Sequence, residues 1–167
     1  MNEASLKYRI KRKWWPLPHR ATISDGQGSI IYKLKGPLFD WFNLHYTLKE
    51  CLSTEVFKIK AIVNSPVCLC PSFTFLKNGV LYGSMSPVSA ISFSYSMEIL
   101  FLDTPKMLLI KEPTFASYKT LVLSTQSEVI AVVISEPKGY EIAIEKYDYL
   151  LQAMLCLSSI EIAGLFR

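Results

Sequence analysis

The chain has 167 residues, of which half are apolar and 19% are charged, and its formal net charge is +4. This composition excludes a disordered chain and predicts one globular domain over residues 1–167. Residues 1–60 carry eleven Lys or Arg against five Asp or Glu, whereas residues 61–167 carry seven against nine. A basic N-terminal part can attract anionic lipid, nucleic acid or acidic protein, although solvated outer strand faces also account for it.

The first predicted elements are short strands joined by hairpins. Residues 6–13 alternate apolar and basic side chains, which is typical of a half-buried strand. Residues 20–24 predict a second strand, and the Asp-Gly pair within residues 25–28 predicts the turn that leads to a third. The apolar face of the third strand is expected to hold Ile30, Tyr32 and Leu34, with Lys33 and Lys35 opposite.

Strands continue to residue 145. Residues 45–50 and 55–63 predict a strand pair, and in the second strand Phe57, Ile59 and Ala61 are expected to oppose Lys58 and Lys60. Further strands are expected at 73–76, 80–85, 89–95, 97–102, 107–111, 118–124, 128–135 and 140–145, with an Asn78-Gly79 hairpin turn. About a dozen strands at hairpin spacing favour an antiparallel barrel or sandwich.

The chain then changes its period. Nearly every residue from Tyr149 to Phe166 is apolar, and Asp148 is expected to cap a helix over about 148–165. Such a helix lies either in a bilayer or inside protein. Gln152 and Glu161 argue against a membrane anchor, since an acidic residue near the centre of a spanning helix costs about 2.5 kcal/mol or more. We therefore expect a mainly β fold in which antiparallel strands close as a β-barrel around one central hydrophobic C-terminal helix.

Residues for catalysis or metal binding are sparse. His19 and His45 have no Cys or Glu at ligand spacing, and the chain contains neither a phosphate-binding loop nor a Gly-x-Ser-x-Gly motif. We expect no enzyme activity, no cofactor and no metal. No signal peptide is recognised, so a reducing, cytoplasmic location without disulfides is expected. The four cysteines are Cys51, Cys68, Cys70 and Cys156, the last in the apolar helix.

Aromatic residues cluster near the basic N-terminal segment. Their side chains can lie at a membrane interface, stack on single-stranded bases, or pack over a barrel end. The chain lacks a recognisable nucleic-acid-binding motif, which argues against the second role. The cluster comprises Trp14, Trp15, Phe39, Trp41 and Phe42.

Two segments resemble a known family. The pattern Tyr8-x-Ile10-Lys11-x-Lys13-x-x-x-Leu17, followed by Thr22-Ile23-x-Asp25-x-x-Gly28-x-x-x-Tyr32-x-Leu34-x-Gly36, is similar to the LURP-one-related proteins. These belong to the Tubby C-terminal-like superfamily, with the phospholipid scramblases as relatives. The ending Asp148-Tyr149-Leu150-Leu151 and its apolar run also resemble that family, so the likeness covers residues 8–36 and 140–166.

The resemblance implies a twelve-stranded barrel around a hydrophobic C-terminal helix, and a non-enzymatic phospholipid- or phosphoinositide-binding role. By likeness to the basic strand site of Tubby domains, the headgroup-binding candidates are Arg9, Lys11, Lys13, Lys58 and Lys60. The expected partner is an anionic lipid surface, met peripherally at the inner face of the membrane. The alternatives are a scramblase-like protein anchored by its C-terminal helix and a structural barrel with no assigned role.

Overall fold

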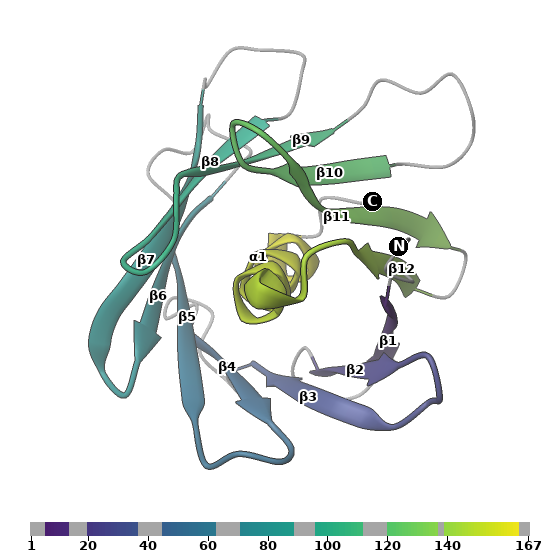
Figure 1. Cartoon of the computed structure of the whole chain (residues 1–167). Coiled ribbons are helices and arrows are strands. Elements are labelled where there is room, and N and C mark those ends of the chain that lie inside the picture. The colour runs from purple at the N-terminus through teal and green to yellow at the C-terminus, as the bar shows by residue number, and fades with distance from the viewer. Residues whose placement is uncertain are drawn as a thin grey trace.

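In the computed structural model of the protein, the described residues form twelve antiparallel strands that close into a barrel around an α-helix (Figure 1). The structure describes residues 6–13, 20–36, 45–62, 71–88, 96–111, 120–136 and 139–163. The strands are β1 (Leu6–Lys13), β2 (Arg20–Asp25), β3 (Ile30–Lys35), β4 (His45–Glu50), β5 (Val56–Ile62), β6 (Ser72–Lys77), β7 (Val80–Pro87), β8 (Ser96–Phe101), β9 (Met107–Lys111), β10 (Thr120–Ser124), β11 (Val129–Glu136) and β12 (Gly139–Ile144). The predicted fold class is confirmed.

Each strand pairs with its neighbours in the chain, and β1 pairs with β12 to close the barrel. In that closing pair Leu6 stands opposite Ile144 and Lys11 stands opposite Gly139. Because consecutive strands are antiparallel, the turns β2–β3, β4–β5, β6–β7, β8–β9 and β10–β11 lie at one end of the barrel, which we name the turn end. The link from β12 to the helix also lies there.

Two turns have the conformation that their sequences predict. Between β6 and β7, Asn78 and Gly79 have φ angles of 52° and 84°, which is the left-handed pair that an Asn-Gly hairpin requires. Between β2 and β3, the Asp25 carboxylate accepts hydrogen bonds from the backbone N–H groups of Gln27 at 2.9 Å and Ser29 at 2.8 Å. Such side-chain bonding is the reason that Asp favours turns.

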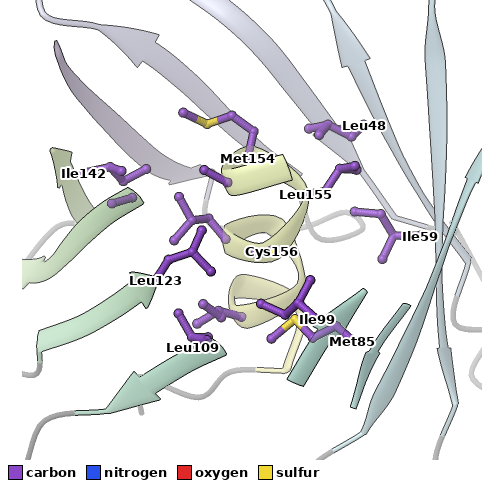
Figure 2. Close-up of a cluster of buried hydrophobic side chains, with 14 of the residues drawn as sticks. Leu48, Ile59, Met85, Ile99, Leu109, Leu123, Ile142, Met154, Leu155 and Cys156 are labelled. Atoms are coloured by element: carbon purple, nitrogen blue, oxygen red, sulfur yellow. The ribbon is translucent and has the colours of Figure 1, made fainter. Parts of the chain in front are cut away.

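The barrel interior is filled by inward side chains and by the helix α1 (Leu150–Ala163). The alternation predicted for β5 is confirmed, because Phe57, Ile59 and Ala61 are buried while Lys58 and Lys60 are exposed. Residues 152–161 of α1 are all buried, and Figure 2 shows strand side chains surrounding the helix. Those labelled in the figure are Leu48, Ile59, Met85, Ile99, Leu109, Leu123 and Ile142.

The two serines of α1 are accommodated by hydrogen bonds to the backbone of the helix itself. The Ser158 hydroxyl donates to the Met154 carbonyl at 2.7 Å, and the Ser159 hydroxyl donates to the Leu155 carbonyl at 3.0 Å. Glu161 is buried as well. Among the described helices, none has both the length and the apolarity required to cross a bilayer. The burial of residues 152–161 makes the helix part of the core of the barrel, as the enclosed-helix prediction stated.

The prediction that Asp148 caps the C-terminal helix was wrong. Asp148 lies inside a 3-10 turn, η1 (Tyr147–Tyr149), and Lys146 occupies the capping position without a side-chain hydrogen bond. The backbone N–H groups of Glu145 and Lys146 both bond to the Ile130 carbonyl of β11. These bonds prolong the sheet connection to residue 146, so the chain tightens into η1 before α1 begins at Leu150.

The prediction that Ile30, the first residue of β3, lies on the buried face of the strand was also wrong. Ile23 stands opposite Tyr32 while Ser24 stands opposite Ile30, so Ile31 is an extra residue in a β-bulge. Cross-strand partners share a face, and Ser24 lies on the outer face of β2. Ile30 is consequently 46% exposed instead of sharing the buried face of Tyr32.

Candidate functional site

Basic side chains gather on the outer face of the barrel over β1–β5. Alternation within each strand turns every second residue outward. We name the exposed cations at these outward positions the basic wall. They are Lys7, Arg9, Lys11, Lys33, Lys35, Lys49, Lys58 and Lys60. Lys13 stands opposite Arg20 in the strand register, but the side chains of both lie outside the described residues.

The strand register aligns the cations of the basic wall in rows across the sheet. Lys11 stands opposite Thr22, Thr22 opposite Lys33, and Lys33 opposite Lys49. A second row runs from Lys35 through Thr47 to Lys58. Directly opposed like charges such as Lys33 and Lys49 destabilise a sheet. The arrangement therefore costs folding free energy that an anionic ligand would recover.

Carboxylates are absent from the outward positions in the described parts of β1–β5. Asp25 and Glu50, which end β2 and β4, stand opposite the inward Tyr8 and Tyr32 in the register. The opposite side of the barrel has a different character. Its outward positions on β8–β11 include Leu100, Leu108, Ile110, Val122, Val132 and Ile134. Among the described strand residues, the outward cations thus gather on the β1–β5 side of the barrel.

Glu141 on β12 borders the basic wall next to β1. Its carboxylate lies 2.8 Å from the Lys7 Nζ and 3.5 Å from an Arg9 guanidinium nitrogen. The hydrogen bond from Lys7, with a smaller contribution from Arg9, lowers the pKa of Glu141. Glu141 therefore stays ionised at neutral pH and engages part of the charge of Arg9, which leaves Lys11 as the more available cation of β1.

The predicted site residues do not converge in one pocket. Arg9 and Lys11 belong to β1, whereas Lys58 and Lys60 belong to β5, four strands away in the barrel. At about 4.8 Å between strands, the two groups lie about 19 Å apart along the sheet. Cations of β3 and β4 fill this interval and join both groups in one extended surface.

Lys33 and Lys35 were predicted to face outward but were not named among the headgroup-binding candidates, and Lys49 was missed as an outward cation. Its signal was present in the sequence, because residue 49 alternates with the apolar Tyr46 and Leu48 and so had to face outward. The aromatic cluster at Trp14, Trp15, Phe39, Trp41 and Phe42, together with Cys68, Cys70 and the strand expected at 89–95, lies outside the described residues. Their predicted roles stay predictions.

A polar network at the turn end joins the buried Tyr82 and Gln152 to the exposed Asp103 and holds the start of α1. The Tyr82 hydroxyl donates to Asp103 Oδ2 at 2.9 Å, and Gln152 Nε2 donates to the Tyr82 hydroxyl at 3.0 Å. Gln152 Nε2 also lies 3.4 Å from Asp103 Oδ1. Burial and the hydrogen bond to Asp103 raise the pKa of Tyr82, so its hydroxyl remains a neutral donor. We assign this network a positioning role for the helix.

Fold and surface together define a class of protein: a closed antiparallel β-barrel with a helical core and a cationic outer wall. No protein-family model, no curated protein and no solved structure matches the chain.

Proposed function

We propose that this protein is a non-enzymatic binding module of the Tubby-like, LURP-one-related kind, which docks on anionic phospholipid headgroups through its basic wall. The observation that carries the proposal is the set of exposed cations on β1–β5. In the described parts of these five strands, no carboxylate occupies an outward position. The closed twelve-stranded barrel around a C-terminal helix is also the architecture that the family resemblance implies. A peripheral contact at the inner, anionic face of the cytoplasmic membrane would suit such a wall.

The size of the electrostatic contribution is adequate for weak docking. Each Lys or Arg near an anionic membrane surface contributes about 1 kcal/mol. Lys11, Lys33 and Lys49 stand in one row, and together they would contribute about 3 kcal/mol, or roughly a hundredfold in affinity. This attraction falls with rising salt, because exposed charges are screened within about 10 Å at 0.1 M ionic strength.

A lipid surface fits the wall better than single-stranded nucleic acid does. Proteins that bind single strands combine cations with aromatic side chains on which the bases stack. Over the described residues of β1–β5, the outward positions between the cations hold Thr, Ser, Val, Ile or His, without an aromatic ring of Phe, Tyr or Trp. The wall therefore offers charge to phosphate groups but no stacking platform.

The scramblase-like alternative, in which the C-terminal helix anchors the protein, gains no support. Residues 152–161 of that helix are buried inside the barrel. Releasing the helix to a bilayer would empty the core and expose the inner faces of the strands. We therefore base the proposal on the outer wall alone.

Co-sedimentation with vesicles tests the proposal. The full chain is mixed at low salt with phosphatidylcholine vesicles, with or without phosphatidylserine, and with a phosphoinositide at matched total charge. We expect binding to both anionic compositions and little to the neutral one. A preference for the phosphoinositide at equal charge would identify that headgroup as the ligand source, and equal partitioning to neutral and anionic vesicles would overturn the proposal.

Matched variants localise the contact. Lys33→Ser with Lys49→Ser removes two positive charges from the wall, whereas Thr120→Glu with Ser124→Glu on β10 lowers the net charge equally on the opposite side. At about 1 kcal/mol per cation, the wall variant should bind anionic vesicles about thirtyfold more weakly, and the β10 variant should change far less. Equal losses in the two variants would show that only net charge matters, contrary to the proposal.

A further inference from the structure

All five hairpins at the turn end carry exposed apolar side chains, including Leu102 in the β8–β9 turn at 75% and Val129 after the β10–β11 turn at 42%. The three neighbouring hairpins formed by β2 to β7 lie on or next to the basic wall. Ile30 follows the β2–β3 turn and is 46% exposed, and Leu52 in the β4–β5 turn is 94% exposed. Val80 and Leu81 follow the β6–β7 turn and are 69% and 53% exposed. We name these four residues the apolar tips. They belong to hairpins that are consecutive in the barrel, and two of the three hairpins are built from strands of the basic wall.

The β4–β5 turn does not use the Leu52 side chain for its own structure. In the β4–β5 turn, the Cys51 N–H donates to the Ile31 carbonyl at 2.7 Å, and the Glu55 N–H donates to the Ser53 hydroxyl at 2.9 Å. These bonds fix the turn while the Leu52 side chain remains in water. A nearly fully exposed leucine gains nothing for folding, and exposed apolar groups that cluster often mark contact surfaces.

Positive charge lies directly behind two of the tips. Lys33 and Lys49 stand opposite each other on β3 and β4, and neither is ion-paired among the described residues. The nearby carboxylates are engaged locally: Asp25 accepts the turn hydrogen bonds, and Glu55 lies 2.9 Å from the Lys77 Nζ. The remaining one, Glu50, is half-buried beside Tyr32, where its charge adds to burial in raising the pKa of that tyrosine.

We infer that the apolar tips insert into the interfacial layer of a bilayer. The barrel then contacts the membrane along the edge where the turn end meets the basic wall. The inference rests on the proposed function for the bilayer itself, and it adds an apolar contact that the electrostatic proposal does not contain. Separate protrusions from three turns fit a soft, planar occupant better than a groove-binding peptide. Lys33 and Lys49 match the negative headgroups that lie above the inserted side chains.

The native Cys51 allows insertion to be measured, because it is exposed and next to Leu52. An environment-sensitive NBD dye is attached to Cys51 in the full chain carrying Cys68→Ser and Cys70→Ser, while Cys156 is buried. On adding phosphatidylserine-containing vesicles we expect a several-fold rise in emission with a blue shift, and quenching by nitroxides on the lipid chains. Vesicle binding without a spectral shift or quenching would overturn the inference and leave the proposed function standing.

Substitutions give an independent readout with unlabelled protein. Ile30→Ser with Leu52→Ser should weaken binding to anionic vesicles about tenfold to a hundredfold, because each substitution removes apolar surface that would leave water on insertion. The matched control is Ile110→Ser with Ile134→Ser on β9 and β11, where both side chains are 41% exposed on the opposite side. Equal effects of the two variants would contradict insertion through the tips.

Two further outcomes distinguish membrane insertion from a failure of the proposed function and from self-association of the chain. If the unchanged protein does not bind anionic vesicles at all, the proposed function fails and insertion fails with it. If the tip variant retains vesicle binding but converts a self-associated protein to a smaller species in size-exclusion chromatography with light scattering, the tips contact a second copy of the chain and the inference is overturned.

Discussion

Truncating Leu155 in the middle of α1 tests whether the helix is the core of the barrel. Leu155 is 0% exposed, and Figure 2 shows it on the side of the helix that faces Leu48 and Ile59. Leu155→Ala removes buried methyl groups and leaves a cavity that the closed barrel cannot readily collapse. Such substitutions cost about 3–5 kcal/mol, which corresponds to roughly 6–20 °C in Tm for a chain of this size.

Leu52→Ala is the matched control, because the same atoms are removed from a side chain that is 94% exposed. A surface substitution of this kind should change the free energy of unfolding by less than about 0.5 kcal/mol. Urea unfolding followed by circular dichroism gives both values, together with the slope that reports on the surface exposed. If Leu155→Ala were as harmless as Leu52→Ala, the helix would not be enclosed by the strands, and the fold would need another core.

Two other predictions concern the close packing of β7 and the protection of α1. A Cβ atom added at Gly83 would lie 2.6 Å from the Leu100 carbonyl oxygen, so Gly83→Ala should destabilise the protein by about 1–3 kcal/mol in the same unfolding assay, and an unchanged midpoint would contradict this packing. Burial raises the pKa of the Cys156 thiol, and since the thiolate is the reactive form, Cys156 should resist maleimide at mildly alkaline pH while the exposed Cys51 reacts. In a chain with Cys68 and Cys70 changed to serine, mass spectrometry measures the maleimide labelling of Cys51 and Cys156 before and after denaturation. Rapid labelling of Cys156 in the folded protein would refute its burial.

Local patterns in the sequence were sufficient for most strands and turns. In β5 the strict alternation of Phe57, Lys58, Ile59 and Lys60 determines both the strand and its faces, because side chains alternate with a period of two. The Asn78-Gly79 turn was equally accessible, since few residue pairs tolerate two positive φ angles. The enclosed helix followed from its lack of a polar face.

Features that depend on how one segment pairs with another could not be predicted. The bulge that turns Ile30 outward arises where β3 gains a residue relative to β2, and the delayed start of the helix arises from bonds to Ile130 in β11. The network of Tyr82, Asp103 and Gln152 joins three segments that lie far apart in the sequence. Each depends on a register that one strand's own residues do not specify.

The candidate surface was predicted in part. Alternation identified Lys11 and Lys58 as outward cations, but only the strand order shows that β3 and β4 lie between them and that Lys49 completes the wall. The Asp-Gly turn of the β2–β3 hairpin was recognised, yet the bulge changes its register by one residue. The extended shape of the surface is therefore a property of the whole barrel.

Energy transfer to labelled lipid headgroups tests most directly whether the basic wall meets the membrane. A donor dye is placed at Thr47→Cys on β4, between Lys35 and Lys58, or at Ser124→Cys on β10, six strands away around the barrel. Cys51, Cys68 and Cys70 are changed to serine in both proteins. On anionic vesicles the account predicts clearly more efficient transfer from position 47 than from position 124. Equal transfer from the two positions, or stronger transfer from position 124, would contradict it.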